Sequence, residues 1–245
     1  MAQQQTTVVI GAASGIGAAT AEVLETAGHV VVRADLNPAE GCRAVDVTDE
    51  ASVEGLFESV VSEYGAFTGA VNCAGVSTFG LVVDHDAAEF RRVVDVCLTG
   101  AFLVLKHAGR RVVDGGSLVT LASLNARQPG NGLVAYCAAK AGLVMLTEVT
   151  ALELGVRGVR VNAVSPGLVV TPLTEPAMAI PGVREDYLDN TPLGRSGEPE
   201  EVGAAIRFLL SDDAAWITGE NLDINGGAHL LRYPDLNKHI TAAFG

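Results

Sequence analysis

Short apolar runs alternate with longer segments of helix-forming residues along the whole chain. The runs lack the polar alternation of a half-exposed strand, and they occupy residues 7–10, 29–32, 69–72, 117–122, 159–164 and 221–224. The helix-like segments occupy residues 16–27, 49–64, 87–113, 134–154 and 199–210. Strands that are apolar on both faces and separated by helices are typical of a parallel sheet covered on both sides. The sequence therefore predicts an α/β fold, a doubly wound parallel sheet of about seven strands with helices on both faces.

Length and composition favour one domain over residues 1–245. The chain has 245 residues, of which 49% are hydrophobic and 18% charged, so it can bury one large core. The interval from Asp35 to Asp46, the expected ends of the second and third strands, is too short for a helical crossover, so we predict a turn through residues 37–41. We interpret the proline-rich residues 172–198 as a substrate loop and residues 228–245 as a C-terminal tail.

A surplus of acidic residues limits the partners that this protein can bind. Lys and Arg number 16 against 29 Asp and Glu, a net charge of −13. Such a surface repels phosphate backbones and anionic lipids, so we expect neither nucleic acid nor membrane as a partner. No basic residue precedes Arg33, as a secretory signal would require, and no unbroken apolar run is long enough to span a membrane. The four cysteines form no CxxC pair, so we expect no metal and reduced thiols in a cytoplasmic protein.

A glycine-rich loop separates the first strand from the first helix. Residues 11–17 read G-x-x-x-G-x-G, which lets a pyrophosphate approach the free amides of a helix N-terminus. Asp35 follows 18 residues after Gly17, where a carboxylate can accept both hydroxyls of an adenosine ribose. That carboxylate would repel a 2′-phosphate, which favours NAD(H) over NADP(H). Two alternatives stay open: a tight turn without a ligand, and an Arg33 that reaches a 2′-phosphate instead of pairing with a carboxylate.

Tyr136 and Lys140 lie four residues apart within an expected helix. This spacing puts both side chains on one helix face, where an ammonium group favours the phenolate form of a neighbouring tyrosine. Such a phenol can donate and accept protons at working pH. Ser123 comes 13 residues before Tyr136, at the end of an expected strand, where α/β sheets place their sites. Capping of the strand end is the alternative role for Ser123.

Together with further motifs, these residues resemble the short-chain dehydrogenases/reductases of the classical type over nearly the full chain. The further motifs are Asp46-Val47, Asn72-Cys73-Ala74-Gly75, Tyr136-Cys137-Ala138-Ala139-Lys140, Pro166-Gly167 with Thr171, and Asp223-Ile224-Asn225-Gly226-Gly227. The resemblance implies a Rossmann-type domain and hydride transfer between NAD(H) and a secondary alcohol or ketone.

The resemblance also implies a role for each matching residue. Tyr136 would be the general acid in ketone reduction and the base in alcohol oxidation. Lys140 would bind the nicotinamide ribose and favour the phenolate, and Ser123 would hydrogen-bond the substrate oxygen. Besides Tyr136 and Lys140, the implied cofactor-binding residues are Gly11, Ser14, Gly15, Ile16, Gly17, Asp35, Leu36, Asp46, Val47, Asn72, Ala74, Gly75, Val169 and Thr171.

Cys97 departs from the family pattern. The family has a catalytic Asn here, which helps to hold a water that links the lysine to solvent. A thiol is a weaker donor and acceptor than a carboxamide. Either another group or water keeps the proton relay working, or the chain binds NAD with weak or lost catalysis.

The sequence indicates the substrate only as a class, a secondary alcohol or its ketone. Arg184 could meet a substrate carboxylate or remain a solvated charge. Family members are often tetramers, so we expect a homo-oligomer (tetramer or dimer), whose tail covers either a neighbour's site or its own subunit. A sugar epimerase or dehydratase would need an extra substrate domain, for which little chain remains after Ile224. The candidates for lining the substrate site are Leu124, Leu133, Met178, Ile180 and Tyr187.

Overall fold

The computed structural model describes residues 5–244, which contain one seven-stranded sheet in which all pairs of neighbouring strands are parallel. The strand order is β3-β2-β1-β4-β5-β6-β7. This order confirms the predicted doubly wound sheet. The strands are β1 (Thr6–Ile10), β2 (Val30–Asp35), β3 (Arg43–Ala44), β4 (Gly69–Asn72), β5 (Ser117–Leu121), β6 (Arg160–Pro166) and β7 (Asn221–Ile224).

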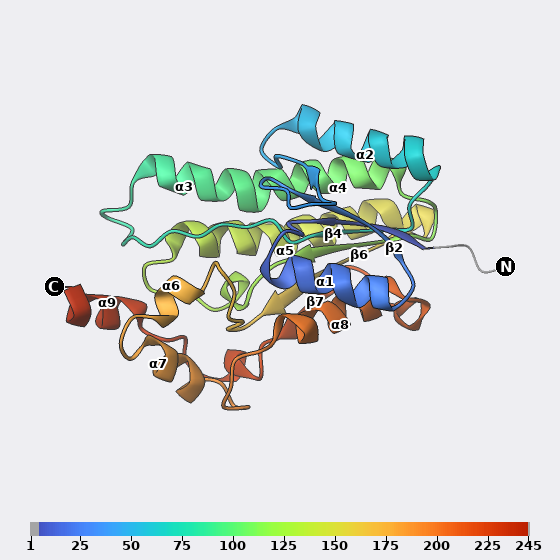
Figure 1. The fold of residues 1–245 in the computed structure, drawn as a ribbon. Coiled ribbons are helices and arrows are strands. Elements are labelled where there is room, and N and C mark those ends of the chain that lie inside the picture. Colours follow the sequence, from blue (N-terminus) through green and yellow to red (C-terminus); the bar gives the residue numbers. More distant parts are fainter. Residues whose placement is uncertain (1–4, 245) are drawn as a thin grey trace.

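Helices cover both faces of the sheet (Figure 1). On one face, α1 (Gly15–Thr26) packs against α8 (Pro199–Leu210). On the other, α4 (Gly100–Arg111) packs between α2 (Glu50–Tyr64) and α5 (Val134–Leu154). Both layers are apolar on their inner side, which is why the strands between them are apolar throughout.

Strand β1 shows how the sequence divides the core between the two faces. Val8 and Ile10 belong to the cluster under α2 and α4, whereas Val9 between them belongs to the cluster under α1 and α8. All three are at most 1% exposed. Successive side chains of a strand point to opposite faces, so each apolar residue contributes to one of the two cores.

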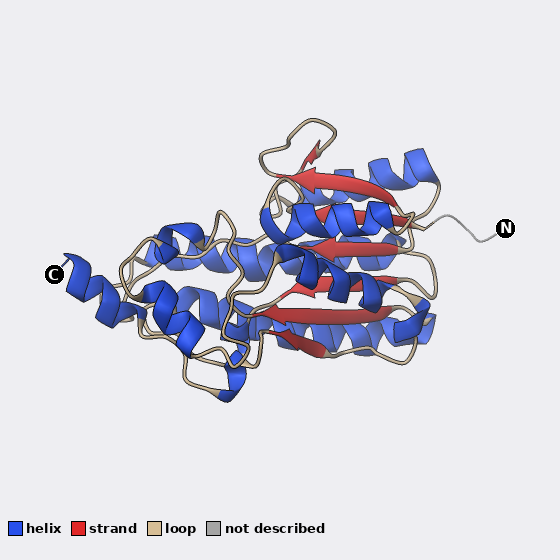
Figure 2. Ribbon diagram, turned by 60° about the horizontal axis from the view of Figure 1, so that its bottom comes forward, coloured by secondary structure: helices blue, strands red, loops and turns tan. Residues whose placement is uncertain are grey.

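The carboxyl ends of the strands define the functional end of the molecule. The chain moves outward from β1 to β2 and β3, and then returns to β4 on the other side of β1. Ligands of open α/β sheets bind at such a reversal, outside the carboxyl ends of the strands. Figure 2 shows the strand arrows pointing toward the end of the molecule that carries the C-terminus. There α6 (Glu175–Met178), α7 (Val183–Asp189) and α9 (Leu236–Phe244) gather (Figure 1).

The structure confirms the predicted turn between the second and third strands. It corrects two other predictions, the end of the third strand and the loop over residues 172–198. The segment 37–41 contains no helix, as expected from its length. The third strand ends at Ala44 instead of Asp46, because it pairs only with Ala34 and Asp35 of β2. Residues 172–198 are not a plain loop, since they contain α6 and α7.

The predicted helix over 87–113 is interrupted. Helix α3 (Ala87–Val94) leads into a π-helical turn (Asp95–Thr99), where the Gly100 amide donates to the Asp95 carbonyl, and α4 ends at Arg111. A Cβ on Gly100 would lie 2.8 Å from Cγ2 of Val47, so the chain approaches the loop after β3 closely at this point. π-helical turns are rare and occur frequently at functional sites.

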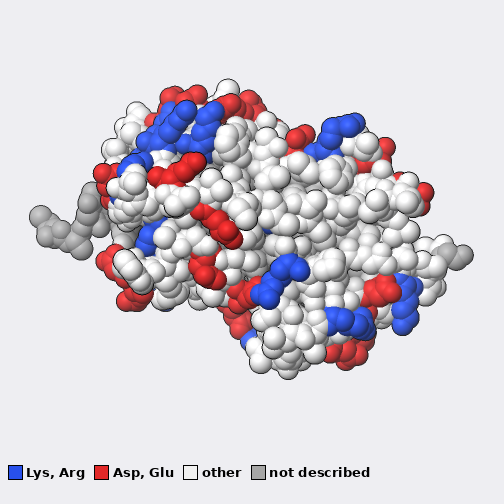
Figure 3. All heavy atoms as spheres, turned by 180° about the vertical axis from the view of Figure 1, so that it is seen from behind, with Lys and Arg blue, Asp and Glu red and all other residues white. Residues whose placement is uncertain are grey.

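The surface agrees with the acidic composition. On the face in Figure 3, Lys and Arg side chains gather at the upper left, with Asp and Glu side chains directly beside them. Among the described residues, Arg111 pairs with Glu54 and Glu58, and Arg157 pairs with Asp114.

Candidate active site

The loop between β1 and α1 holds the first turn of α1 against the sheet. Gly11 has φ 80° and Gly15 has φ 54°, conformations that favour glycine. A Cβ on Gly17 would lie 1.9 Å from the Gly11 carbonyl oxygen, so no larger residue fits between helix and loop. Ser14 precedes α1. Among the described residues, no side chain hydrogen-bonds to the amides at the start of this helix, and its first turn contains no Asp or Glu. The free amides at this N-terminus therefore form a site for an anion.

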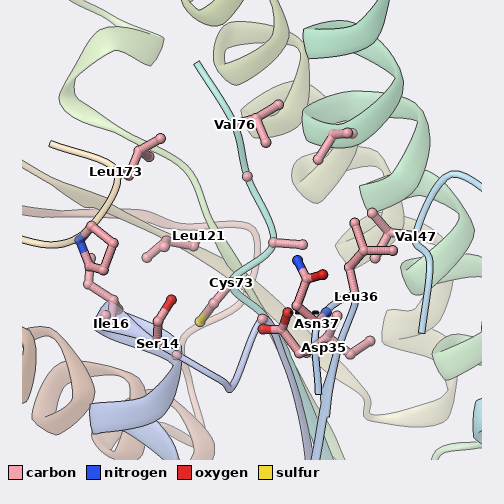
Figure 4. A pocket seen from close by; sticks show the side chains of 18 of the residues that line it. Ser14, Ile16, Asp35, Leu36, Asn37, Val47, Cys73, Val76, Leu121 and Leu173 are labelled. Atoms are coloured by element: carbon pink, nitrogen blue, oxygen red, sulfur yellow. Dashed lines mark hydrogen bonds between the residues drawn. The ribbon is translucent and has the colours of Figure 1, made fainter. Parts of the chain in front are cut away.

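A cavity of about 290 Å³ extends from this loop along the carboxyl ends of β1, β2 and β4 (Figure 4). Asp35, Leu36 and Asn37 lie at one end, and Leu173 at the other. No residue that lines it is Lys or Arg. Of the predicted cofactor-binding residues, those that line it are Gly11, Ser14, Gly15, Ile16, Gly17, Asp35, Leu36, Asp46, Val47, Ala74, Gly75 and Thr171.

Two of the predicted cofactor-binding residues lie behind the cavity wall. Asn72 is buried, and its Oδ1 accepts from the Ala74 amide at 3.1 Å. Val169 is also buried, and its carbonyl accepts from Thr174 Oγ1 at 2.7 Å. Both residues shape segments that reach the cavity without lining it themselves.

The Asp35 carboxylate is fixed at the mouth of the cavity. Its Oδ2 accepts from the Ala13 amide and its Oδ1 from the Asn37 amide, each at 3.0 Å. Arg33 does not line the cavity, because its guanidinium pairs with Glu25 through two hydrogen bonds of 2.8 and 2.9 Å. The local charge at this end of the cavity is therefore negative.

Ser123 and Tyr136 line a second cavity, of about 150 Å³, beside the first. Lys140 is 2% exposed, and its Nζ lies 5.6 Å from the centre of the Tyr136 ring. The same Nζ donates to the Leu121 carbonyl at 2.5 Å and lies 3.7 Å from the Cβ position of Gly75, which lines the first cavity. The Lys140 Nζ thus lies close to a wall residue of each cavity, although Lys140 itself lines neither of them. Ser123 Oγ also accepts from the Asn125 amide at 3.1 Å, so the serine caps the turn that follows β5.

The wall of the second cavity comes from the turn after β5, from α5, from residues 172–198 and from the tail. Of the five predicted substrate contacts, Leu124, Leu133, Met178 and Tyr187 line it, while Ile180 packs behind them. Arg184 is exposed and does not line it. Lining residues that the sequence did not lead us to assign to this wall are Ser77, Asn125, Pro166, Gly167, Leu168, Leu173, Thr174, Ala177, Tyr233 and Leu236.

The C-terminal tail packs on its own chain through Asp186 of α7. The Asp186 carboxylate accepts from the Arg232 guanidinium, from the Asp235 amide at 3.0 Å and from His239 Nε2 at 3.0 Å. Burial works to raise the pKa of Asp186, but these hydrogen bonds outweigh it and lower that pKa. The charged carboxylate therefore holds the tail over the second cavity at neutral pH.

Comparison with known proteins places this geometry in a family. Residues 11–229 match the model of a family described as enoyl-(acyl carrier protein) reductase. The structure of a short-chain type dehydrogenase/reductase from Mycobacterium ulcerans superposes with a TM-score of 0.94 at 35% identity, over 99% of this chain and 96% of that one. The chain belongs to the short-chain dehydrogenase/reductase family.

Two curated relatives of this short-chain dehydrogenase/reductase are named as dehydrogenases of small alcohols. It is 39% identical to the D-threitol dehydrogenase of Mycolicibacterium smegmatis, over 90% of this chain and 91% of that protein. It is 37% identical to the NAD-dependent glycerol dehydrogenase of Listeria innocua, over 90% and 92% of the two chains.

Cys97, where the family has an asparagine, lies in the π-helical turn and is 1% exposed. Its Sγ accepts from the Val76 amide at 3.4 Å and donates to the Val76 carbonyl at 3.2 Å. One thiol thus satisfies both the amide and the carbonyl of Val76. The weakness expected of a thiol at this position concerned the water of the proton relay, which these contacts do not involve. The segment after β4 is held in place without a carboxamide.

We expect Cys97→Asn to change kcat by less than about threefold, because the thiol already fixes Val76. The measurement is steady-state turnover with saturating alcohol and cofactor. A tenfold or larger rise in kcat, about 1.4 kcal/mol of barrier, would show instead that the cysteine impairs the proton relay. Such a rise would favour the alternative of a nucleotide-binding protein with weak catalysis.

The other thiols near the cavities stay protonated. Burial raises the pKa of Cys73 to about 12, against the opposing effect of Lys140. Burial also raises the pKa of Cys137. Since the thiolate is the reactive form of cysteine, neither residue is suited to act as a nucleophile at neutral pH.

Proposed function

We propose that this protein is an NAD-dependent oxidoreductase that interconverts a secondary alcohol and its ketone. The observation that carries the proposal is the position of the Lys140 Nζ close to a wall residue of each cavity, with Tyr136 and Ser123 on the wall of the smaller one. A nicotinamide cofactor in the larger cavity would accept the hydride of the alcohol or return it to the ketone.

The residues of the larger cavity fit a dinucleotide. The uncapped N-terminus of α1 can bind the pyrophosphate, and the Asp35 carboxylate can accept from the adenosine ribose hydroxyls. A Cβ on Gly15 would lie 3.3 Å from Thr171, so glycine keeps the space between these two walls open. Val169 and Thr171, in the segment after β6, would fix the carboxamide of the nicotinamide.

Tyr136 would hold the proton that the substrate oxygen loses or gains. Its phenol donates this proton during ketone reduction and accepts it during alcohol oxidation. The Lys140 Nζ lies 5.6 Å from the centre of the Tyr136 ring and so places a positive charge beside this phenol. Ser123 would donate a hydrogen bond to the substrate oxygen, on which negative charge develops.

The charge at the mouth of the larger cavity favours NAD over NADP. The Asp35 carboxylate repels a 2′-phosphate, and the cavity wall offers no Lys or Arg to bind one. Two unit charges about 4 Å apart interact by about 4 kcal/mol at an effective dielectric constant of 20. Screening by solvent at this open mouth reduces that figure, because the neighbouring Leu36 is 62% exposed.

We therefore expect Asp35→Asn to lower the preference for NAD over NADP by about tenfold to a hundredfold. The ratio of kcat/KM for the two cofactors measures the effect at one alcohol concentration. Glu40→Gln is the control, since it removes the same charge from an exposed residue that does not line the cavity. An unchanged ratio in Asp35→Asn would contradict the role given to this carboxylate.

The proposed function itself is tested by a panel of secondary alcohols and ketones with NAD(H) and NADP(H). Absorbance of the reduced nicotinamide reports turnover in both directions. We expect turnover with at least one neutral alcohol, faster with NAD than with NADP. Absence of turnover with every alcohol and ketone, in a protein that binds NADH, would refute the proposal and favour the non-catalytic alternative.

We further propose a homo-oligomer, because an apolar stripe remains exposed along α5 and its extension. Met145, Val149, Leu152 and Val156 recur at helical spacing and are 45% to 92% exposed, and Phe102 of α4 is 46% exposed. The stretch Val134–Arg157, which contains this stripe, has the length and the mean hydropathy (1.3) of a membrane span. The opposite face of the helix packs on β6 and carries Lys140.

Large exposed apolar patches mark interaction sites, and a second copy of this chain is the simplest partner for the stripe. Light scattering of the purified protein measures its molar mass and so tests this proposal. The mass of a monomer would contradict it.

A further inference from the structure

Two tyrosines and an asparagine form a chain of hydrogen bonds on the wall of the smaller cavity. The Tyr187 and Tyr233 hydroxyl oxygens are 2.6 Å apart, and Tyr233 donates to Asn125 Oδ1 at 3.1 Å. The Asn125 Nδ2 donates to the Gln128 carbonyl at 3.0 Å, which makes Oδ1 the acceptor facing Tyr233. The three residues come from α7, the tail and the turn after Ser123, and all line the same cavity as Tyr136.

The direction of this chain is determined by counting protons. A neutral phenol has one O–H to donate. Burial raises the pKa of Tyr187 to about 12 and that of Tyr233 well above its ordinary value, so both phenols are neutral at working pH. Tyr233 gives its proton to Asn125, and therefore Tyr187 must give its own to Tyr233. The Tyr187 oxygen is left with acceptor capacity only.

The rest of the wall offers no cation to an anion. None of the residues that line the cavity is charged. A carboxylate or phosphate placed here would lose its hydration without gaining a cation, and it would face the lone pairs of Tyr187. A hydroxyl group suits the position, because it can donate its proton to the Tyr187 oxygen.

The volume limits the size of the ligand. The cavity of about 150 Å³ matches the size of a void that accommodates a benzene molecule. It is therefore suited to a compound of about four to six carbon atoms.

We propose that Tyr187, oriented by Tyr233 and Asn125, selects small neutral polyols by accepting a hydrogen bond from a second hydroxyl group of the substrate. This inference rests on the proposed alcohol oxidation and names its substrate class. The tail takes part in the selection, because Tyr233 fixes the proton of Tyr187. Tyr187 and Tyr233 are specificity-determining residues, distinct from the acid/base Tyr136.

The test uses three alcohols that share one ring and differ only in the distal group. They are cyclohexanol, cyclohexane-1,4-diol and 4-hydroxycyclohexanecarboxylate, and linear four-carbon tetrols extend the comparison to open chains. With the parent protein and NAD, we expect kcat/KM for the diol to be at least tenfold higher than kcat/KM for cyclohexanol. The difference between the diol and the carboxylate should be larger still. A site built to bind a hydroxyl discriminates strongly against analogues that lack it.

The two phenol variants are expected to act differently. Tyr187→Phe removes the acceptor, so the ratio of kcat/KM for the diol to kcat/KM for cyclohexanol should fall to within about threefold of unity. Tyr233→Phe frees the Tyr187 proton for the ligand, so the ratio of diol to carboxylate should fall by about threefold to tenfold. Tyr64→Phe, in the last turn of α2 and outside the cavity, is the control for loss of a phenol hydroxyl. Melting temperatures of the three variants verify that each is folded.

The outcomes separate this inference from the function on which it rests. Turnover of cyclohexanol or the carboxylate at least as efficient as that of the diol would overturn the inference and leave the oxidoreductase intact. A Tyr187→Phe protein with the parent's ratio of diol to cyclohexanol turnover would also overturn the inference and leave the oxidoreductase intact. Absence of NAD reduction with every alcohol would overturn both.

Discussion

Tyr136→Phe is expected to lower kcat by about 10³-fold while leaving NADH affinity within about threefold of the parent. General acid–base catalysis by a positioned side chain contributes about 10² to 10⁴ in rate, and phenylalanine removes only the group that carries the proton. Ring packing is maintained, because Phe keeps the aromatic ring beside Lys140, which lies 5.6 Å from its centre. Stopped-flow or steady-state turnover measures the loss, and quenching of NADH fluorescence measures the affinity.

Tyr64→Phe provides the matched control for this experiment. It removes a phenol hydroxyl from the last turn of α2, outside both cavities. Its kcat should remain within about threefold of the parent. A Tyr136→Phe protein that retains a tenth or more of the parent's kcat would show that another group carries the proton.

Most residues that line the larger cavity could be predicted from the sequence because they belong to local motifs. The loop of residues 11–17 follows a strand and opens a helix, so its glycines could be placed at a helix N-terminus from their neighbours alone. Tyr136 and Lys140 share a helix face for the same reason. The position of Asp35 could be predicted because this residue ends the second strand. Each of these inferences used the regular period of one element.

The part of the smaller cavity's wall that comes from the C-terminal tail could not be predicted, because long-range contacts build it. Tyr233 reaches Asn125 across more than a hundred residues of sequence, and its tail is held by Asp186, which no motif singles out. The π-helical turn depends on the close packing of Gly100 on Val47, which the sequence period does not reveal. The two-residue strand β3 exists only through its pairing with β2. Such features follow from tertiary packing, for which local patterns carry no signal.

Gly17→Ala is expected to cause the largest loss of cofactor binding of any single methyl addition in the loop. The new Cβ would lie 1.9 Å from the Gly11 carbonyl oxygen and 2.7 Å from its carbonyl carbon, distances that no rotamer can relieve because both partners are backbone atoms. The start of α1 must therefore move away from the loop, and the free amides move with it. We expect the Kd for NADH to rise by at least about a hundredfold, and the free energy of unfolding to fall by about 3 kcal/mol.

Gly55→Ala makes the same chemical change where the structure has room for it. Gly55 lies on the exposed side of α2, and nothing comes within 4 Å of its Cβ position. Alanine in a helix interior is favoured over glycine by about 0.5–1 kcal/mol, so this variant should be slightly more stable than the parent and bind NADH unchanged. Denaturant unfolding and NADH titration of both variants measure the two effects. If Gly17→Ala binds NADH as tightly as Gly55→Ala does, the amides at the start of α1 do not hold the pyrophosphate, and the dinucleotide must bind elsewhere along the sheet edge.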